Sequence, residues 1–493
     1  MTQLETNYRL LPFQFMRLGG RTLVVNQAGE CYVLPDTDFQ RFTTHALEAS
    51  DAHFLNLKAK HFLADSDLAL PVQLLATKYR TKKSFLRNFT ALHMFVLTLR
   101  CNQKCSYCQV CSEGADASRF DMQPETARRA VEVAFQSPSS HIKIEFQGGE
   151  PFLNFRVMQQ IVEQAKALNG DHKKHLEFVA CTNLVSVTDE QLLYCKANQI
   201  LISTSLDGPR EIHNACRSME SGKGSYDRAV EGIARARAIV GENQVDSLMT
   251  TTRASLGHVH EIVDEYVNQG FRSIFLRSLN PFGRARATSS RYEVTEFVSF
   301  YREGLDYIIG LNVSGVPIAE QYARIVLTRM LTPFSTGFVD LQSPTGAGIG
   351  CAIYDYDGSV YVSDEGRMLG RIGDTTFRMG SVLRDDYRAL FGGEVIRRMV
   401  GASCVECLPE CVDCAFRMWC GADPVRNYAT QGDMVGHRPS SEVCRKNQAI
   451  IRYLLDAVAM EEPQVLDVFW AWITNRSVAE VRFIGRKGGE CAR

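Results

Sequence analysis

The sequence predicts an α/β fold around a parallel sheet, with a small α+β unit before it and a cysteine-rich extension after it. From about residue 90, short apolar runs alternate with helical patterns, the order expected of strands joined by right-handed helical crossovers. Residues 1–80 contain a hairpin pattern followed by helices, and residues 336–450 are poor in periodicity and rich in Cys, Gly and Asp. An open barrel, a closed barrel and a doubly wound sheet share this alternation.

Composition narrows the class of protein. The 493 residues allow two or three domains with well-buried cores, and 45% hydrophobic and 23% charged residues are ordinary for a globular protein. The net charge of −1 leaves no basic surface for nucleic acid. No apolar run reaches the roughly 18 residues of a membrane span, and the N-terminus lacks a signal-peptide pattern. We therefore expect a cytoplasmic protein without nucleic acid or membrane as partner.

The N-terminal unit is predicted to begin with a hairpin. Residues 21–26 and 31–34 are short apolar runs around the turn Gln27-Ala-Gly-Glu30, and helical patterns follow at 36–46 and 54–62. Strands followed by helices resemble the winged-helix peptide-recognition elements of many peptide-modifying enzymes. Such an element would add a leader peptide to a sheet edge as an extra strand. A structural cap on the sheet domain fits the same pattern.

The central domain is assigned to residues 88–335. Its strands are predicted at 92–99, 142–146, 176–180, 200–206, 245–251 and 273–276. Its helices are predicted at 124–135, 157–167, 189–196, 226–238 and 259–268, with two more at 295–309 and 319–331. The cysteine-rich region follows, and residues 451–493 are predicted to form a helical tail.

Three closely spaced cysteines end the first strand of this domain. The chain has 16 cysteines and no export signal, which favours metal or redox use over disulfides. Cys101, Cys105 and Cys108 could hold three irons of a 4Fe–4S cluster and leave the fourth iron open for chemistry. A ferredoxin site starting at Cys105, or a four-cysteine zinc site that includes Cys111, uses the same residues.

The spacing C-x3-C-x2-C, with Tyr107 before the last cysteine, resembles the radical S-adenosylmethionine (SAM) enzymes. In that family SAM chelates the open iron, and an electron from the cluster releases a 5′-deoxyadenosyl radical. The protein supplies placement and shielding. The resemblance implies a partial (βα)6 barrel with active residues at the C-terminal ends of its strands, and it implies that Tyr107 lies near the adenine.

Further motifs match the same family. Gln147-Gly-Gly-Glu-Pro151 follows the second strand, and its glycines allow close approach of the backbone to a ligand. It resembles the family's GGEP motif, which implies that Gly148, Gly149 and Glu150 hold SAM's amino group, although Gly-Gly-Glu-Pro alone is a common loop. The string at 203–217 resembles a signature of the peptide-modifying subgroup. The resemblance implies that Asn183, Ser205 and Arg217 bind SAM near its methionine and ribose groups. Alternatively, each of these residues caps a helix or anchors a loop.

The C-terminal half resembles the SPASM extension, which carries auxiliary iron–sulfur clusters. The family spacing implies an outer cluster bound by four cysteines: Cys411, Cys414, Cys420 and Cys444. A zinc ribbon is the alternative for this set.

The inner auxiliary cluster departs from the pattern. Cysteines expected near Ser363 and at Asp423 or Pro424 are absent, while two extra cysteines stand upstream. Cys351, Cys404 and Cys407 could hold an inner cluster instead, with Asp423 or substrate as the fourth ligand. A single auxiliary cluster, with these cysteines spare, is the alternative.

One branch of the SPASM family resembles the chain over most of its length: the radical SAM maturase of the His-Xaa-Ser system. Residues 11–15, 57–62, the cysteine loop and residues 419–424 carry this likeness. It implies hydrogen abstraction from a precursor peptide leading to a crosslink or an oxidised side chain, a reductant such as flavodoxin or ferredoxin, and a companion radical SAM enzyme. A sulfatase-maturing type of enzyme and a non-catalytic iron–sulfur electron carrier are the alternatives.

Overall fold

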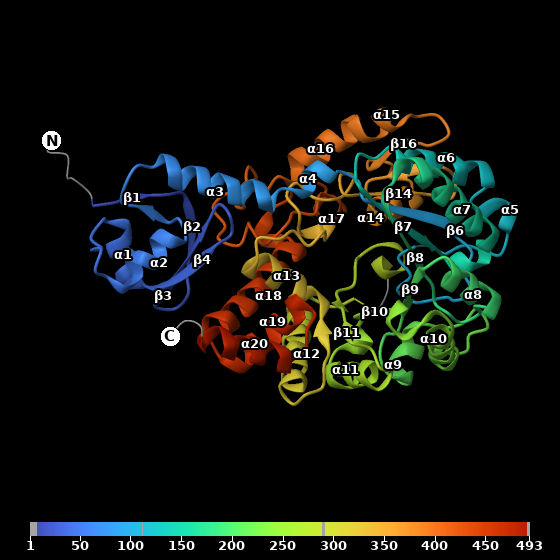
Figure 1. Ribbon diagram of the computed structural model, residues 1–493. Coiled ribbons are helices and arrows are strands. Elements are labelled where there is room, and N and C mark those ends of the chain that lie inside the picture. The colour runs from blue at the N-terminus through green and yellow to red at the C-terminus, as the bar shows by residue number, and fades with distance from the viewer. Residues whose placement is uncertain (1–6, 111, 288–290, 491–493) are drawn as a thin grey trace.

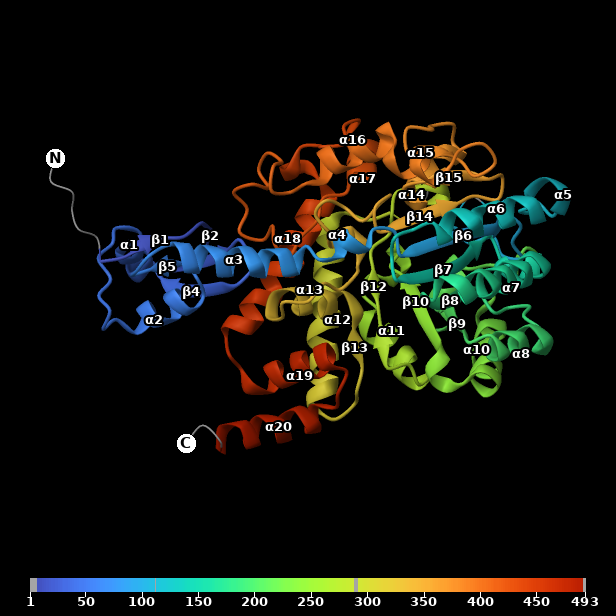
Figure 2. The same cartoon turned by 45° about the horizontal axis from the view of Figure 1, so that its top comes forward.

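The computed structural model describes residues 7–110, 112–287 and 291–490. The N-terminal unit lies at one end of the molecule and the sheet domain at the other, with C-terminal elements between and above them (Figure 1). Helix α3 runs from the N-terminal unit toward the sheet domain in both Figure 1 and Figure 2. Within the described residues, no helix has the length and apolarity to cross a membrane.

The central sheet confirms the predicted α/β fold. Its strand order is β12-β10-β9-β8-β7-β6-β14-β15-β16, and neighbouring strands from β6 to β12 are parallel. The order leaves the sheet open between β12 and β16, so it is a partial barrel. The six strands of the predicted domain are β6 (Leu92–Thr98), β7 (His141–Gly148), β8 (His175–Cys181), β9 (Ile200–Ser205), β10 (Val245–Thr250) and β12 (Leu276–Arg277).

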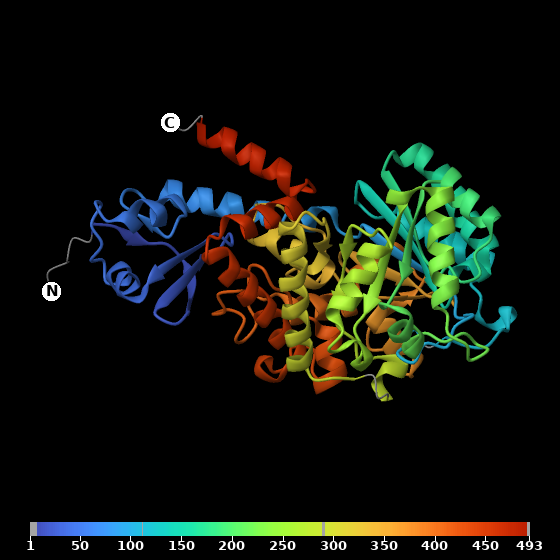
Figure 3. The same cartoon turned by 90° about the horizontal axis from the view of Figure 1, so that it is seen from below.

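Helices cover the outer face of this sheet (Figure 3). Along β7, Ile142, Ile144 and Phe146 are fully buried against the helices, and the residues between them face the inside of the barrel. Each such apolar side chain contributes roughly 1.5–3 kcal/mol by leaving water. The helices are α6 (Pro124–Phe135), α7 (Phe155–His172), α8 (Asp189–Ala197), α9 (Arg210–Cys216), α10 (Tyr226–Val240) and α11 (Val259–Asn268).

The cysteine-rich region is not as irregular as its sequence predicts. Strand β14 (Cys351–Tyr354) pairs in parallel with β6, and β15 (Ser359–Tyr361) and β16 (Arg378–Ser381) extend the same sheet antiparallel. All four residues of β14 are buried, so no alternation marks the strand. The helices here are α14 (Asp364–Arg371), α15 (Tyr387–Gly392), α16 (Glu394–Ser403) and α17 (Pro424–Gln431).

The N-terminal unit contains the predicted hairpin, to which one further strand is added in the same sheet. Strands β2 (Phe13–Arg17), β3 (Arg21–Asn26) and β4 (Cys31–Pro35) form an antiparallel sheet. Val24 packs toward the helices of the unit, whereas Leu23 and Val25 join the main core. The remaining elements are β1 (Arg9–Leu10), β5 (Leu63–Ala64), α1 (Asp36–Thr43), α2 (Ala52–Ala59) and α3 (Ala69–Lys82).

The turn between β3 and β4 docks on the cysteine-rich region. Trp419 Nε1 donates a hydrogen bond to the Gly29 carbonyl (3.2 Å), and Arg417 Nη2 donates to Gln27 Oε1. Gly29 has φ +81, and a Cβ there would lie 3.2 Å from both Met418 Cβ and Trp419 Nε1. The N-terminal unit therefore contacts the segment between Cys414 and Cys420 directly.

Long helices close the structure, as the sequence predicts for 295–309, 319–331 and the tail. Helix α12 packs against α18 and α19, and α13 packs against α19. They are α12 (Val294–Val313), α13 (Gln321–Leu331), α18 (Glu442–Ala459), α19 (Pro463–Thr474) and α20 (Val478–Glu490). Shorter elements are α4 (Phe85–Asn88), α5 (Ala117–Phe120), β11 (Ser273–Ile274) and β13 (Ala319–Glu320).

Candidate cofactor sites

The sequence motifs lie at one rim of the barrel. The cysteine loop follows β6, Gly148 ends β7, Asn183 follows β8 and Ser205 ends β9. These are the C-terminal ends of neighbouring parallel strands, so their side chains share the face where such folds place their chemistry.

The Gly-Gly-Glu turn lies against the start of the cysteine loop. Gly149 N donates to Thr98 O (2.8 Å), and Glu150 N donates to Arg100 O (2.8 Å). A Cβ on Gly149 would stand 2.1 Å from the Arg100 carbonyl oxygen, and one on Gly148 would stand 2.4 Å from the Thr98 oxygen. Glycine is required here because the two backbones touch.

The three cysteines of the loop are partly exposed neighbours. Burial raises the pKa of the Cys101 thiol to about 12, and negative charge at Glu150, Cys105 and Cys108 adds to this effect. Burial also raises the pKa of Cys105 to about 11. A thiol with a raised pKa stays protonated in the absence of a metal, but binding to a metal cation deprotonates it. Three such thiols in one loop therefore fit the ligand set of an iron–sulfur cluster. Cys111 lies outside the described residues.

No three His, Cys, Asp or Glu side chains in the described ranges converge on a point that one metal ion could occupy. A 4Fe–4S cluster does not need its ligands to converge on one point, because each thiolate binds a different iron.

Glu150 is fixed by neighbours from the next strand. Its carboxylate accepts hydrogen bonds from Thr182 Oγ1 (2.8 Å), Asn183 N (2.9 Å) and Phe152 N (3.2 Å). Burial raises the pKa of Glu150 to about 7, against the effect of these hydrogen bonds. The Asn183 side chain donates to Asn102 Oδ1 (2.7 Å), inside the cysteine loop. The structure therefore brings Glu150, Asn183 and the cysteine loop together.

Arg217 and Tyr107 meet at a residue to which sequence reasoning gave no role. Asp207 is 1% exposed, and its carboxylate accepts from Tyr107 Oη (2.6 Å) and Arg217 Nε (2.9 Å). The Arg217 guanidinium also lies over the Tyr107 ring, 5.3 Å from its centroid. The string Ser-Leu-Asp-Gly contained the signal, because an acid directly after a strand end can orient a downstream arginine.

The four outer cysteines line a single cavity of about 350 Å³. Cys444 experiences the charges of the other three thiols, which places all four as neighbours. Two amides also reach the sulfurs: Asn447 Nδ2 lies 3.5 Å from Cys420 Sγ, and Gln448 Nε2 lies 3.3 Å from Cys444 Sγ. Amide donors to ligating sulfurs are a common outer layer of iron–sulfur sites. This donor set and its cavity fit a cluster.

The three cysteines predicted for the inner cluster do not share the surroundings of the outer four. Cys351 is buried in β14 among apolar side chains, and its Sγ lies 3.5 Å from the Val362 carbonyl. Cys404 lies beside Glu406 and faces Cys407, which is exposed. The inner cluster stays a prediction.

Helix caps occupy the two positions where the SPASM pattern has its missing cysteines. Ser363 Oγ accepts from Gly366 N (3.2 Å) at the start of α14, and Asp423 Oδ1 accepts from Arg426 N (2.9 Å) at the start of α17. Each side chain satisfies a free amide of a first helical turn. In this structure both side chains therefore serve as helix N-caps.

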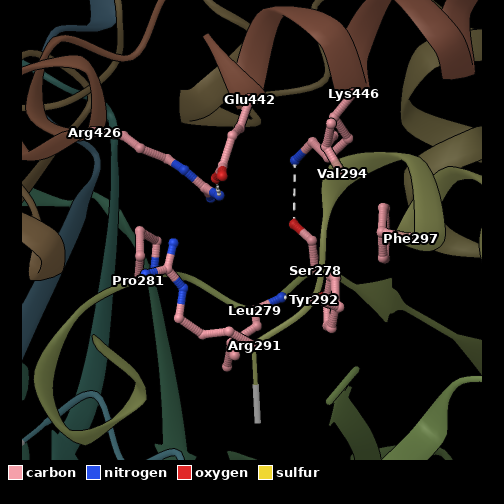
Figure 4. A pocket seen from close by; sticks show the side chains of 10 residues that line it. All are labelled: Ser278, Leu279, Pro281, Arg291, Tyr292, Val294, Phe297, Arg426, Glu442 and Lys446. Carbon is pink, nitrogen blue, oxygen red and sulfur yellow. Dashed lines mark hydrogen bonds and ion pairs between the residues drawn. The ribbon is translucent and has the colours of Figure 1, made fainter. Parts of the chain in front are cut away.

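A small charged cavity of about 30 Å³ lies beyond the end of β12 (Figure 4). Arg426 Nη2 pairs with Glu442 Oε2 (3.1 Å), and Lys446 Nζ lies 3.5 Å from Ser278 Oγ. Burial lowers the pKa of Lys446 to about 8. The lining residue Leu279 also packs with Tyr107, so the cavity borders the barrel rim.

A second set of charged groups near this cavity also escaped sequence reasoning. Asn280 Nδ2 donates to Glu365 Oε1 (3.2 Å), and Asn280 Oδ1 accepts from Arg426 Nη1 (2.8 Å). Burial, and then the carboxyls of Asp340, Asp364 and Asp423, raise the pKa of Glu365 above its usual range. These residues meet only after folding, and no local motif marks them.

Relatives share parts of this chain. The cysteine-type anaerobic sulfatase-maturating enzyme of Clostridium perfringens is 24% identical over 296 residues, covering 56% of this chain and 76% of that protein. An uncharacterized protein of Archaeoglobus fulgidus is 26% identical over 388 residues, covering 75% of this chain and 84% of its own.

Solved structures share the fold. The structure of anSMEcpe with bound AdoMet superposes with a TM-score of 0.62 at 18% identity, covering 77% of this chain and 99% of that one. Streptococcus suis SuiB bound to precursor peptide SuiA gives 0.52 at 13% identity, covering 89% and 100%. At these identities the likeness concerns the fold.

The family comparison covers the barrel motifs. Residues 95–266 match the Radical SAM superfamily, a range that includes the cysteine loop, the Gly-Gly-Glu turn and Asp207. The match, the partial barrel and the three neighbouring thiols agree. This segment is a radical SAM domain, and the cofactors of its superfamily are a 4Fe–4S cluster and SAM.

Proposed function

We propose that this chain is a radical SAM enzyme of the SPASM type that modifies a ribosomally made precursor peptide. The observation that carries the proposal is the cavity lined by Cys411, Cys414, Cys420 and Cys444, which adds a second cluster-like thiol set to the radical SAM domain. The printed names of its relatives support a protein or peptide substrate: a sulfatase-maturating enzyme, and SuiB with its precursor peptide.

The bound cluster and SAM would supply a 5′-deoxyadenosyl radical, which takes a hydrogen atom from the peptide. Cys101, Cys105 and Cys108 would hold three irons of that cluster. Gly148, Gly149 and Glu150 would receive SAM's amino group, and Asn183 and Ser205 its polar groups. Arg217, which Asp207 holds and whose guanidinium lies over the Tyr107 ring, would contact SAM near its methionine and ribose groups.

The narrower assignment is to the His-Xaa-Ser system, with a flavodoxin or ferredoxin as reductant and a companion radical SAM enzyme. Residues 336–450 would form the auxiliary cluster domain, with Cys351, Cys404 and Cys407 as ligands of an inner cluster. The likeness of the N-terminal and cysteine-loop segments to that branch supports this assignment.

Mass spectrometry of the product tests the proposal. A synthetic peptide with His-Xaa-Ser repeats is incubated anaerobically with reconstituted enzyme, SAM and dithionite. We expect loss of two hydrogen atoms from the peptide, dependent on SAM and absent with Cys101→Ala. A parallel reaction contains a cysteine-bearing sulfatase peptide, because one relative named above is a cysteine-type sulfatase-maturating enzyme. Conversion of the sulfatase peptide alone would support the sulfatase-maturing function instead.

The N-terminal unit would hold the leader of this peptide. Strands β2 and β4 each pair only with β3 among the described residues, so both could accept an added strand. Helix α3 presents exposed apolar side chains in the same unit: Leu70 at 64%, Val72 at 47% and Leu74 at 44%. Exposed apolar groups and strands without a second partner in one small unit suit an extended peptide with apolar anchors.

The double variant Leu70→Ser/Leu74→Ser is therefore expected to weaken peptide binding about tenfold or more, because burial of each leucine contributes on the order of 1 kcal/mol. Fluorescence anisotropy with the labelled repeat peptide measures it. SAM cleavage without peptide should not change. Leu193→Ser is the matched control, since Leu193 is 56% exposed on α8 of the barrel. An unchanged dissociation constant in the double variant would make the unit a structural cap.

Point substitutions are a cleaner test than truncation. Removal of residues 1–80 would also uncover Trp419 and leave the Arg417 guanidinium without Gln27, beside two of the outer cysteines.

A further inference from the structure

The outer cysteine cavity contains an arginine, Arg438, that has no ion-pair partner among the described residues. Arg438 begins a short turn of 3-10 helix (Arg438–Ser440), is 7% exposed and lines the cavity with the four cysteines. Its Nε and Nη2 atoms are buried and have no hydrogen-bond partner among the described residues. Two acids, Glu410 and Asp423, also line the cavity, but neither is ion-paired with Arg438 in the described part of the chain.

Other arginines beside these cysteines are held by the protein. Arg417 Nη2 donates to Gln27 and its Nη1 to the Val412 carbonyl, and Arg329 Nη2 donates to the Met418 carbonyl (3.1 Å). Arg417 and Arg329 each keep one buried nitrogen, Nε, without a partner in the described part of the chain, whereas Arg438 has two, Nε and Nη2, and lines the cavity itself. Burial raises the pKa values of Cys411, Cys420 and Cys444, and the charge of the nearby Arg438 guanidinium offsets part of that rise, in keeping with its place in the same cavity.

A buried guanidinium without a counter-charge is costly, because it has lost its hydration without gaining an anion. An iron–sulfur cluster with four thiolate ligands would supply that anion, since the thiolates outweigh the positive charge of the core. Reduction by one electron makes the cluster more negative. A fixed cation and N–H donors at its sulfurs then stabilise the reduced form more than the oxidised form.

We propose that Arg438 is the counter-cation of the outer four-cysteine cluster and raises its reduction potential, which favours this cluster as an electron acceptor. The inference rests on the auxiliary cluster of the proposed function. The redox change is one electron gained by the cluster, and Arg438 stays protonated throughout.

The test is a redox titration with dithionite and mediators, followed by electron paramagnetic resonance. It uses the full chain carrying Cys101→Ala, Cys105→Ala and Cys108→Ala, so that only auxiliary clusters contribute. The relevant signal is the one that a further Cys411→Ala change removes. We expect Arg438→Gln to shift the equilibrium about tenfold toward the oxidised form, a fall of about 59 mV for one electron. Arg438→Lys should recover most of this fall.

Arg452→Gln is the matched control, because Arg452 is an exposed arginine on the same helix as Cys444. An unchanged potential in Arg438→Gln, or equal falls in the Gln and Lys variants, would contradict the role of charge. If Arg438→Gln no longer retains iron, retention by Arg438→Lys supports the proposal and loss in both overturns it.

Iron analysis of the triple-alanine variant distinguishes a failure of the auxiliary cluster from a failure of the role of Arg438. At least one cluster of about four irons should remain there. Zinc in place of iron would overturn the auxiliary cluster, and the role of Arg438 with it. Iron with an unchanged potential would overturn the role of Arg438 alone.

Discussion

Alanine at Cys101, Cys105 or Cys108 is expected to abolish SAM cleavage. Each change leaves one iron without its thiolate, and the loop has little regular structure to preserve the site without the cluster. Anaerobically reconstituted enzyme is assayed for 5′-deoxyadenosine by liquid chromatography and for bound iron. We expect no detectable product and a loss of about four irons per chain, with the iron of the auxiliary site retained.

Cys111→Ala is the control within the same stretch of sequence. A fourth protein thiolate would block the iron that SAM needs, so this variant should keep its iron and its product. Loss of 5′-deoxyadenosine in the Cys111 variant alone would contradict the assignment of the three ligands.

Asp207→Ala is expected to lower the free energy of unfolding by about 3–5 kcal/mol, because removal of one partner of a buried ion pair leaves the other charge uncompensated. Arg217 is 12% exposed and Asp207 1%, and the Tyr107 hydroxyl loses its acceptor in the same step. Guanidinium unfolding of the reconstituted protein, followed by circular dichroism, measures the change. Asp189→Ala is the matched control: it breaks an exposed pair with Arg235 and should cost about 1 kcal/mol or less.

The double variant Asp207→Ala/Arg217→Met separates stability from cofactor binding. Removal of both charges should recover much of the lost stability, because no unpaired ion remains buried. SAM cleavage should stay low if Arg217 faces SAM as proposed. Full recovery of both stability and SAM cleavage would show that the pair is structural only.

Much of the barrel could be predicted because its strands and helices repeat. The helices at 124–135 and 259–268 begin and end as predicted, since each has a clear apolar face and a start or stop signal. Strand β14 could not be predicted in the same way. It is four residues long and fully buried, and its partner β6 lies more than 250 residues earlier.

The residues of the candidate site also fall into a group that the sequence predicts and a group that it does not. Cys101, Gly149 and Glu150 stand in short contiguous motifs with a characteristic spacing, so the sequence alone could predict them as site residues. The spacing of the four outer cysteines predicts a second site in the same way. The positions of these residues depend on local structure, namely a loop, a tight turn and a compact cysteine-rich segment.

Only the tertiary structure showed which side chains complete these motifs. Asp207 pairs with Arg217, Arg438 lies against the outer cysteines, and the turn at Gly29 docks on Trp419 from a distance of 390 residues. Such partner residues belong to no recognisable sequence motif, because any residue of suitable charge or size could make the same contact. Only long-range packing brings them together. The sequence by itself determined the cofactor chemistry and the barrel, whereas folding decided the electrostatic environment of each cofactor site.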